Sequence, residues 1–268
     1  MYSILEVPFH MGMEAVAAGK GPGLLVRAGA DRALETRGIP ASVSHVRLRD
    51  STTSGLDAVV DVNRQISLAV REAREQGVLP VVLAGNCNSC LGTIAGCDDV
   101  ERLGIVWLDA HPDFHTPQTS ISGSLEGMAL AAAVGHCHSE LRERIGLERA
   151  VSEQDVVLAG VYDIEPGERG RLEDSWISVH PSDSVGLLPV ALEQLASRVD
   201  AVYLHLDVDV TGGMETPAVV QLIRLVRATL PVAAVALTNY NPDLDTDGRA
   251  GAAALELLAA LKPGESIQ

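Results

Sequence analysis

Basic residues are scarce in this chain of 268 residues, where 20 lysines and arginines stand against 36 aspartates and glutamates, a formal net charge of −16. A surface this acidic repels phosphate backbones and anionic lipids, so nucleic acids and membranes are poor partners and cations are better ones. Aromatic residues make up only 3% of the chain. This scarcity argues against a base-stacking platform, and it leaves the core mainly aliphatic.

Cysteines are few, and long hydrophobic runs are missing. The four cysteines, Cys87, Cys90, Cys97 and Cys137, are too few to staple a chain of this length with disulfides, so a reducing cytoplasm fits. No stretch approaches the roughly 18 apolar residues of a membrane span, and the first ten residues lack the basic start of a signal peptide. We therefore expect a soluble cytoplasmic protein.

Short apolar runs rich in β-branched residues alternate with longer segments of helical periodicity. Strands are predicted at residues 3–7, 43–47, 79–84, 104–109, 155–160, 176–179, 201–207 and 232–237, and helices at 57–75, 188–199 and 216–230. Such alternation predicts an α/β fold with a mostly parallel sheet covered on both faces. We find no linker or repeat, so residues 1–268 are expected to form a single domain.

Polar residues directly after two predicted strands carry the chemistry. Asp109, His111 and Asp113 follow one strand, and Asp207 and Asp209 follow another. Alternate residues at a strand end project to the same side, so each set can converge. Crowded carboxylates beside an apolar strand need cations to neutralise them, and shared aspartates with one imidazole suit two Mn²⁺ ions about 3.5–4 Å apart. Ordinary helix caps and loop acids are the alternative, and it is weaker for two such clusters than for one.

The sequence resembles the ureohydrolase family of arginases and agmatinases. The resemblance rests on segments 18–22, 83–88, 109–113, 122–123, 160–168, 207–209 and 241–242. It implies a three-layer α/β/α arginase-like fold with an eight-stranded parallel sheet and two Mn²⁺ per chain. It also implies that a metal-activated hydroxide attacks a guanidino carbon. Asp109 and Asp207 would bridge the ions, with Asp113 at one ion and His111 and Asp209 at the other.

One departure from the family concerns the ligand that follows the third predicted strand. The family carries Gly-Gly-Asp-His there, and the His binds the first metal; Cys87 aligns with this His, and a thiolate is a competent ligand. A shift of one residue would instead present Asn88, a weaker carbonyl ligand. We prefer Cys87 because Gly85 then keeps the place of the second glycine.

Other departures concern the residues around the substrate. The family's proton-shuttling His falls on Glu126, which would act if burial raises its pKa and would be inert as a surface acid. Contacts of arginases to the α-amino-acid head group fall on His115, Ser122 and Glu165, although His115 could also be only a rim residue. These polar types favour an α-amino acid over agmatine.

The guanidinium-anchoring Glu of arginases is replaced by Asn239. Because a guanidinium prefers a carboxylate partner, this change predicts a less basic group in the substrate, such as the hydroxyguanidine of Nω-hydroxy-L-arginine. Its hydrolysis gives hydroxyurea and L-ornithine. Arginine is the alternative substrate, and a catalytically silent relative is the alternative of another class.

Two segments are shorter than in the family. The loop between Asp209 and Gly212 is either deleted or missing from this sequence, and we favour the second explanation. The chain also ends soon after Leu261, without the tail that trimeric arginases use, so a monomer is expected.

Overall fold

Eight parallel strands form the centre of the computed structural model, which describes residues 1–50 and 53–262. Their order across the sheet is β4-β1-β5-β10-β9-β6-β7-β8. The bounds are β1 Tyr2–Val7, β4 Ser42–His45, β5 Leu79–Ala84, β6 Leu103–Leu108, β7 Val156–Val161, β8 Ser178–Pro181, β9 Ala201–Asp207 and β10 Val232–Thr238. The predicted parallel α/β/α architecture is therefore confirmed.

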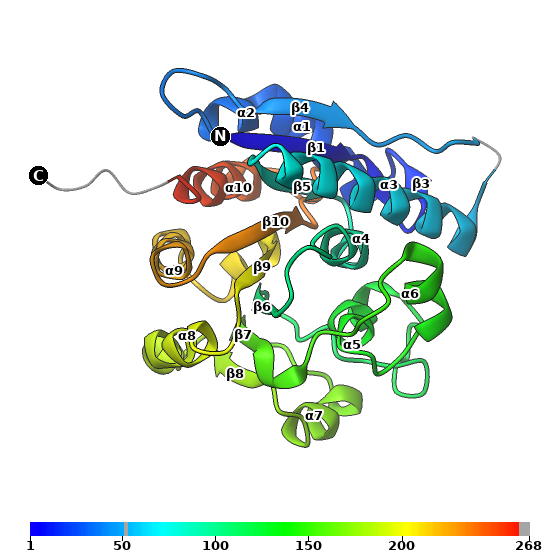
Figure 1. Cartoon of the computed structure of the whole chain (residues 1–268), viewed down its shortest axis with the longest axis vertical. Coiled ribbons are helices and arrows are strands. Elements are labelled where there is room, and N and C mark those ends of the chain that lie inside the picture. Colours follow the sequence, from blue (N-terminus) through cyan, green and yellow to red (C-terminus); the bar gives the residue numbers. More distant parts are fainter. Residues whose placement is uncertain (51–52, 263–268) are drawn as a thin grey trace, which may run out of the picture.

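Helices cover both faces of the sheet because the central strands are apolar on both sides. One face is covered by α3 Gly55–Glu75, α4 Ser89–Ala95, α5 Ala129–Ala133 and α6 Ser139–Ile145. The other is covered by α1 Gly21–Ala28, α2 Ala30–Ala33, α8 Leu188–Ala196, α9 Thr216–Thr229 and α10 Arg249–Ala260. Figure 1 shows the two helix layers on opposite sides of the sheet, with α7 Pro166–Glu173 beside the β8 edge.

The order of the strands decides which loops meet at the carboxyl edge. β9 pairs with β6 on one side and with β10 on the other, and β10 pairs with β5. Thr238 is the register partner of Asp207, and Leu108 is the partner of Leu206. Residues that directly follow β5, β6, β9 and β10 therefore share one edge, where ligands bind in open α/β sheets.

The predicted strands all exist, with small shifts at their ends. β8 starts and ends two residues later than predicted, and β4 runs over 42–45 rather than 43–47. Sequence analysis missed the antiparallel pair β2 Phe9–His10 and β3 Met13–Glu14, because strands of two residues carry no periodicity. The helices predicted at 57–75, 188–199 and 216–230 correspond to α3, α8 and α9.

Asp209 and the short segment after it lie in a single 3-10 turn, Val208–Gly212, which is followed by α9. The Tyr162 ring packs directly on it, so that a Cβ added at Gly213 would lie 2.1 Å from Tyr162 Cδ1. Residues 263–268, which include the end of the chain used in the monomer prediction, lie outside the described residues. Among the residues that are described, no helix is both long and apolar enough to span a membrane.

Candidate metal centre

Asp109 lies immediately beyond β6 and is almost fully buried. Its Oδ2 accepts a hydrogen bond of 2.9 Å from Trp107 Nε1, and its Oδ1 accepts one of 2.8 Å from the His111 backbone N–H. Two donors from its own strand end therefore fix both carboxylate oxygens. This gives Asp109 a defined orientation at the carboxyl edge of the sheet.

Asp207 and Asp209 approach Asp109 from the neighbouring strand β9. The Asp209 backbone N–H donates to Asp207 Oδ1 at 3.0 Å, and Asp209 Oδ1 accepts from Ala110 N at 3.2 Å. His111 Nδ1 lies 3.0 Å from Asp209 Oδ2 and 3.6 Å from Asp109 Oδ1. The two acidic strand ends predicted from the sequence therefore converge.

Cys87 joins this group from the loop after β5. Its thiol is buried and donates to Asp207 Oδ2 at 3.0 Å. Asn239 Nδ2 in turn donates to Cys87 Sγ at 3.1 Å. The side chain that the resemblance aligns with a metal-binding histidine thus faces the aspartate cluster.

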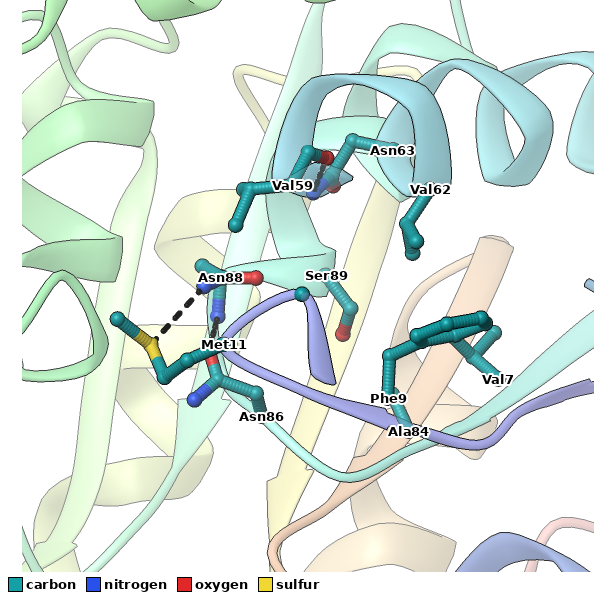
Figure 2. A pocket seen from close by; sticks show the side chains of 11 residues that line it. Val7, Phe9, Met11, Val59, Val62, Asn63, Ala84, Asn86, Asn88 and Ser89 are labelled. Carbon is teal, nitrogen blue, oxygen red and sulfur yellow. Dashed lines mark hydrogen bonds between the residues drawn. The ribbon is translucent and has the colours of Figure 1, made fainter. Parts of the chain in front are cut away.

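Asn88, the alternative ligand, points elsewhere. Its Nδ2 lies 3.6 Å from Met11 Sδ, and its backbone N–H donates to Asn86 Oδ1 at 3.0 Å. Figure 2 shows these side chains lining a small internal cavity between the β5–α4 loop and α3. Within the described residues, Asn86 Nδ2 and Ser89 Oγ at this cavity have no hydrogen-bond partner. The geometry therefore supports the register that uses Cys87.

The ligand atoms form two overlapping groups, each within 4.8 Å of one another. One group contains Cys87, Asp109, His205 and Asp207, and the other contains Asp109, His111 and Asp209. Asp109 belongs to both groups, as a bridging ligand would. Oxygen, nitrogen and sulfur donors of this kind fit a pair of divalent transition ions.

Burial and mutual repulsion disfavour the ionised form of several acids in the cluster. Burial, together with the charges of neighbouring aspartates, raises the pKa of Asp113 and Asp207 well above the usual range and that of Asp109 to about 7. Burial and the surrounding carboxylates likewise raise the pKa of the Cys87 thiol. Hydrogen bonds to Asp109 and Asp209 raise the pKa of His111 to about 12. Two divalent cations would remove this conflict, so the residues fit the metal pair that the acidic pattern predicts.

Asp113 completes the acidic lining under backbone strain. It adopts φ +49°, a left-handed conformation that non-glycine residues rarely occupy. Its carboxyl is buried, and Oδ2 has no hydrogen-bond partner among the described residues. A strained backbone and an unpaired buried oxygen are both accounted for if Asp113 contributes to the metal site.

A cleft of about 310 Å³ opens above the acidic cluster. Its lining includes Glu126, which begins a 3-10 turn at Glu126–Met128, is half-buried, and has a pKa raised by burial. Glu126 is therefore not a freely exposed surface acid, and its role in proton transfer stays a prediction.

His115 is buried rather than on the rim, and it lines the cleft together with Glu165. Its Nε2 lies 3.1 Å from Glu165 Oε2, and its Nδ1 lies 3.1 Å from Thr119 Oγ1. Glu168, which sequence analysis missed, accepts from the backbone N–H groups of Phe114 and Glu165. It thereby ties the start of α7 to the segment that carries Asp113.

Ser122 is placed differently from the other predicted head-group contacts. It is exposed, and its Oγ accepts from the Ser124 backbone N–H at 3.1 Å within its own loop. Ser124, rather than Ser122, lines the cleft. The sequence offered no signal for this choice, because both are serines in a loop without periodicity.

Asn239 closes the end of the cleft next to the aspartates, in a left-handed conformation with φ +63°. Its Nδ2 donates to Asp207 Oδ2 at 2.6 Å and to Cys87. Its Oδ1 is buried and without a hydrogen-bond partner among the described residues. Because its amide nitrogen is engaged by the acidic cluster, Asn239 offers a free acceptor.

His205 is fully buried and hydrogen-bonded behind the cluster. Trp107 stacks on its ring, with centroids 3.5 Å apart. A signal for both residues existed in the sequence: each lies on a predicted strand, two positions before a cluster aspartate, and alternate residues share a face.

Comparisons with known proteins agree with this geometry. A model of the Arginase family matches residues 1–262. The arginase of Bacillus caldovelox is 30% identical over 290 aligned positions that cover 97% of each chain. The arginase of Brevibacillus brevis is 32% identical over 232 positions, which cover 81% of this chain and 78% of that relative.

Solved structures show the same likeness over the whole chain. The arginase structures from Bacillus caldovelox and Bacillus cereus both superpose with a TM-score of 0.86, at 27% and 26% identity. Each alignment covers 100% of this chain and 99% of the other. With a family model that spans nearly the whole chain, relatives that match from end to end, and the acidic strand ends in place, the protein belongs to the arginase family of metal-dependent hydrolases.

Proposed function

We propose that the protein is a binuclear manganese amidinohydrolase that hydrolyses Nω-hydroxy-L-arginine to hydroxyurea and L-ornithine. In Cys87, Glu126 and Asn239 it resembles the hydroxyarginine amidinohydrolase of D-cycloserine biosynthesis, so a role in antibiotic biosynthesis is part of the proposal. The proposed ligands are Cys87, Asp109, His111, Asp113, Asp207 and Asp209, with Asp109 and Asp207 shared by two Mn²⁺. When bound, these ions supply an activated water and a positive charge that polarises the guanidino group.

The observation that carries the substrate assignment is the orientation of Asn239. Its amide nitrogen is engaged by Asp207 and Cys87, and the side chain lines the cleft. Its Oδ1 is an uncharged acceptor that has no hydrogen-bond partner among the described residues. A hydroxyguanidine, which is less basic than a guanidine, can donate its N–O–H to such an acceptor without needing a carboxylate opposite. A guanidinium would leave more of its charge uncompensated there.

Glu126 is the proposed proton carrier of the reaction. One bond forms, from the water oxygen to the guanidino carbon, and one breaks, from that carbon to the δ-nitrogen that becomes the ornithine amine. The proton released by the water is accepted by the Glu126 carboxylate and passed to the departing nitrogen. A carboxyl whose pKa is raised by burial is better matched to both transfers than an ordinary surface acid.

The α-amino-acid end of the substrate is proposed to lie at His115, Ser122 and Glu165. Glu165 stands at the cleft with one side exposed, where it can pair with an α-ammonium group. His115 is held by Glu165 and Thr119, which orients its ring toward the same end. Ser122 would have to reach this end from its loop.

Hydrolysis of L-arginine is the second candidate, and it is favoured by the relatives, which are named arginases. Steady-state kinetics with saturating Mn²⁺ on the two substrates separates the candidates. We expect kcat/KM to be higher for Nω-hydroxy-L-arginine, by as much as about 10⁴-fold. L-Arginine lacks the hydroxyl, so it would leave the polar groups that bind this hydroxyl without a hydrogen-bond partner. Equal values would assign the chain to the ordinary arginases.

A catalytically silent relative is tested by metal analysis of the purified protein. Two Mn²⁺ per chain with no turnover of either substrate would favour it over both enzymes. The proposed monomer is tested separately by light scattering, for which a trimeric mass would be the contrary result.

A further inference from the structure

A chain of hydrogen bonds leads from the middle of β9 to the acidic cluster. Tyr203 Oη lies 2.7 Å from His205 Nδ1, and His205 Nε2 lies 3.3 Å from Thr238 Oγ1. Thr238 Oγ1 donates to Asp207 Oδ2 at 3.2 Å. All four side chains are buried, with exposed fractions of 0% to 1%.

The strands place these residues in line. Tyr203, His205 and Asp207 are alternate residues of β9, so they lie on one face of the sheet. Thr238 is the register partner of Asp207 on β10, which brings its hydroxyl next to that carboxylate. This chain of hydrogen bonds therefore follows from the register of two neighbouring strands.

The donor and the acceptor of each hydrogen bond in this series can be assigned, starting from Thr238. Thr238 Oγ1 donates to Asp207 Oδ2, so its single hydroxyl proton is used there. Thr238 must then accept from His205, which requires the proton on His205 Nε2. A neutral imidazole protonated at Nε2 has Nδ1 free to accept from the Tyr203 hydroxyl. Each group then donates once, and no buried proton is left without an acceptor.

Both ring nitrogens of His205 are thereby engaged, although one lies within ligand distance of the cluster. Trp107 stacks on the same ring at an interplanar angle of 8°, and its Nε1 donates to Asp109 Oδ2. The imidazole is therefore held on its flat face as well as at both nitrogens. It is linked to Asp207 through Thr238 and lies against the residue that orients Asp109.

We propose that His205 is a positioning residue of the metal centre, which, as the neutral Nε2–H tautomer, aims the Thr238 hydroxyl at Asp207 and holds this bridging carboxylate in place for the ion pair. The inference rests on the proposed function, because Asp207 must be a metal ligand. His205 itself donates no electron pair to an ion. Groups that orient metal ligands from behind typically contribute about 10–100-fold to metal affinity.

Mn²⁺ affinity and stoichiometry, measured by calorimetry and metal analysis, test the proposal independently of activity. Thr238→Val keeps the side-chain shape and removes the hydroxyl, and we expect it to weaken Mn²⁺ binding about 10–100-fold. Thr238→Ser keeps the hydroxyl and should bind Mn²⁺ within a few-fold of the wild-type protein. His205→Phe keeps the ring stack on Trp107 and should lose affinity as Thr238→Val does.

The double variant shows whether His205 and Thr238 act through one series of hydrogen bonds or affect the metal site separately. If His205 acts through Thr238, then His205→Phe combined with Thr238→Val should bind Mn²⁺ about as weakly as Thr238→Val alone. Losses that multiply in the double variant would overturn the proposal. So would a Thr238→Val protein that binds two Mn²⁺ as tightly as the wild type.

Thr93→Val is a matched control for the loss of a buried threonine hydroxyl, because within the described part of the chain Thr93 Oγ1 bonds only to Ser89 O in α4. It should lower the melting temperature of the metal-free protein without a loss of Mn²⁺ affinity. A loss equal to that of Thr238→Val would show a general packing effect and refute the proposal. A wild-type protein that binds no Mn²⁺ would refute the proposed metal centre together with this inference.

Discussion

The Cys87 thiol donates a hydrogen bond to Asp207 Oδ2 across 3.0 Å, although the two residues are 120 positions apart in the chain. Burial and nearby carboxylates raise the pKa of this thiol, so without a cation it keeps its proton. A metal ion at this place would take over the role of that proton. In the proposed metal centre, both residues of this contact would bind the same ion.

Cys87→Ala is expected to lower Mn²⁺ occupancy from two ions to about one per chain and to abolish most turnover, because one site loses a ligand. Cys87→His should retain both ions, since imidazole is a good ligand for divalent ions and is the ligand that the resemblance implies at this position. Metal analysis after dialysis measures both results. Unchanged occupancy and rate in the alanine variant would show that Cys87 is not a ligand.

Asn88→Ala is the control for the neighbouring register. Its side chain contacts Met11 rather than the aspartates, so the variant should keep two Mn²⁺ and lose only some stability. Loss of an ion from Asn88→Ala but not from Cys87→Ala would move the ligand to Asn88.

Asn239→Glu is expected to shift substrate preference toward L-arginine, because it restores a carboxylate for the guanidinium. A charge-assisted hydrogen bond exceeds a neutral one by about 1–2 kcal/mol, so the ratio of kcat/KM for the two substrates should move about 5–30-fold. Metal content is measured first, because the new acid lies beside Asp207. Asn239→Ala should weaken hydroxyarginine turnover without a gain for arginine, and an unmoved ratio in Asn239→Glu would contradict the specificity role.

Glu126→Gln is expected to lower kcat by about 10²–10⁴-fold while Mn²⁺ content stays at the wild-type level, because the amide cannot accept a proton. In the wild-type protein, activity should fall as the pH drops through the pKa of Glu126. Burial raises that pKa, so this acid limb should lie above the usual range of a glutamate and should be absent in the variant.

Glu165→Gln serves as the comparison for Glu126→Gln, since it makes the same chemical change at the other end of the cleft. It should raise KM and leave kcat nearly unchanged, because Glu165 is proposed to bind the substrate and not to move protons. The reverse pattern, with kcat lost at Glu165 and kept at Glu126, would exchange the two assignments.

Cys97 gives a stability prediction away from the metal centre. Burial raises the pKa of this thiol to about 12, an effect that the charge of Arg74 only partly offsets. The folded state therefore keeps the proton that the unfolded chain releases near pH 9, so stability is complete below pH 9 and is lost as the pH rises toward 12. Between pH 8 and pH 10.5 the metal-free wild type should lose about 2 kcal/mol more than Cys97→Ala.

Urea unfolding of both proteins at the two pH values measures this difference. Cys97→Ala leaves a small cavity at both pH values, so the cavity cost cancels in the comparison. Equal losses in the two proteins would show that the thiol ionises without unfolding.

The sequence alone was enough to predict the parallel α/β architecture and the place of the site. Strands buried on both faces read as continuous apolar runs, and the helices between them carry their own periodicity, so both signals are local. Asp109 and Asp207 follow such runs directly, and parallel strands bring their carboxyl ends to one edge. The acidic cluster was therefore predictable before any contact between β6 and β9 was known.

Only the tertiary structure decided how the neighbours of the cluster divide their roles. Cys87 faces Asp207 while Asn88 turns away, and Ser122 stays in its loop while Ser124 lines the cleft. His205 is hydrogen-bonded to Thr238, which lies 33 positions further along the chain, and Thr238 in turn donates to Asp207. Such choices depend on the register of β10 against β9 and on backbone conformations such as the left-handed Asn239, which arise when strands pair and not within any one segment.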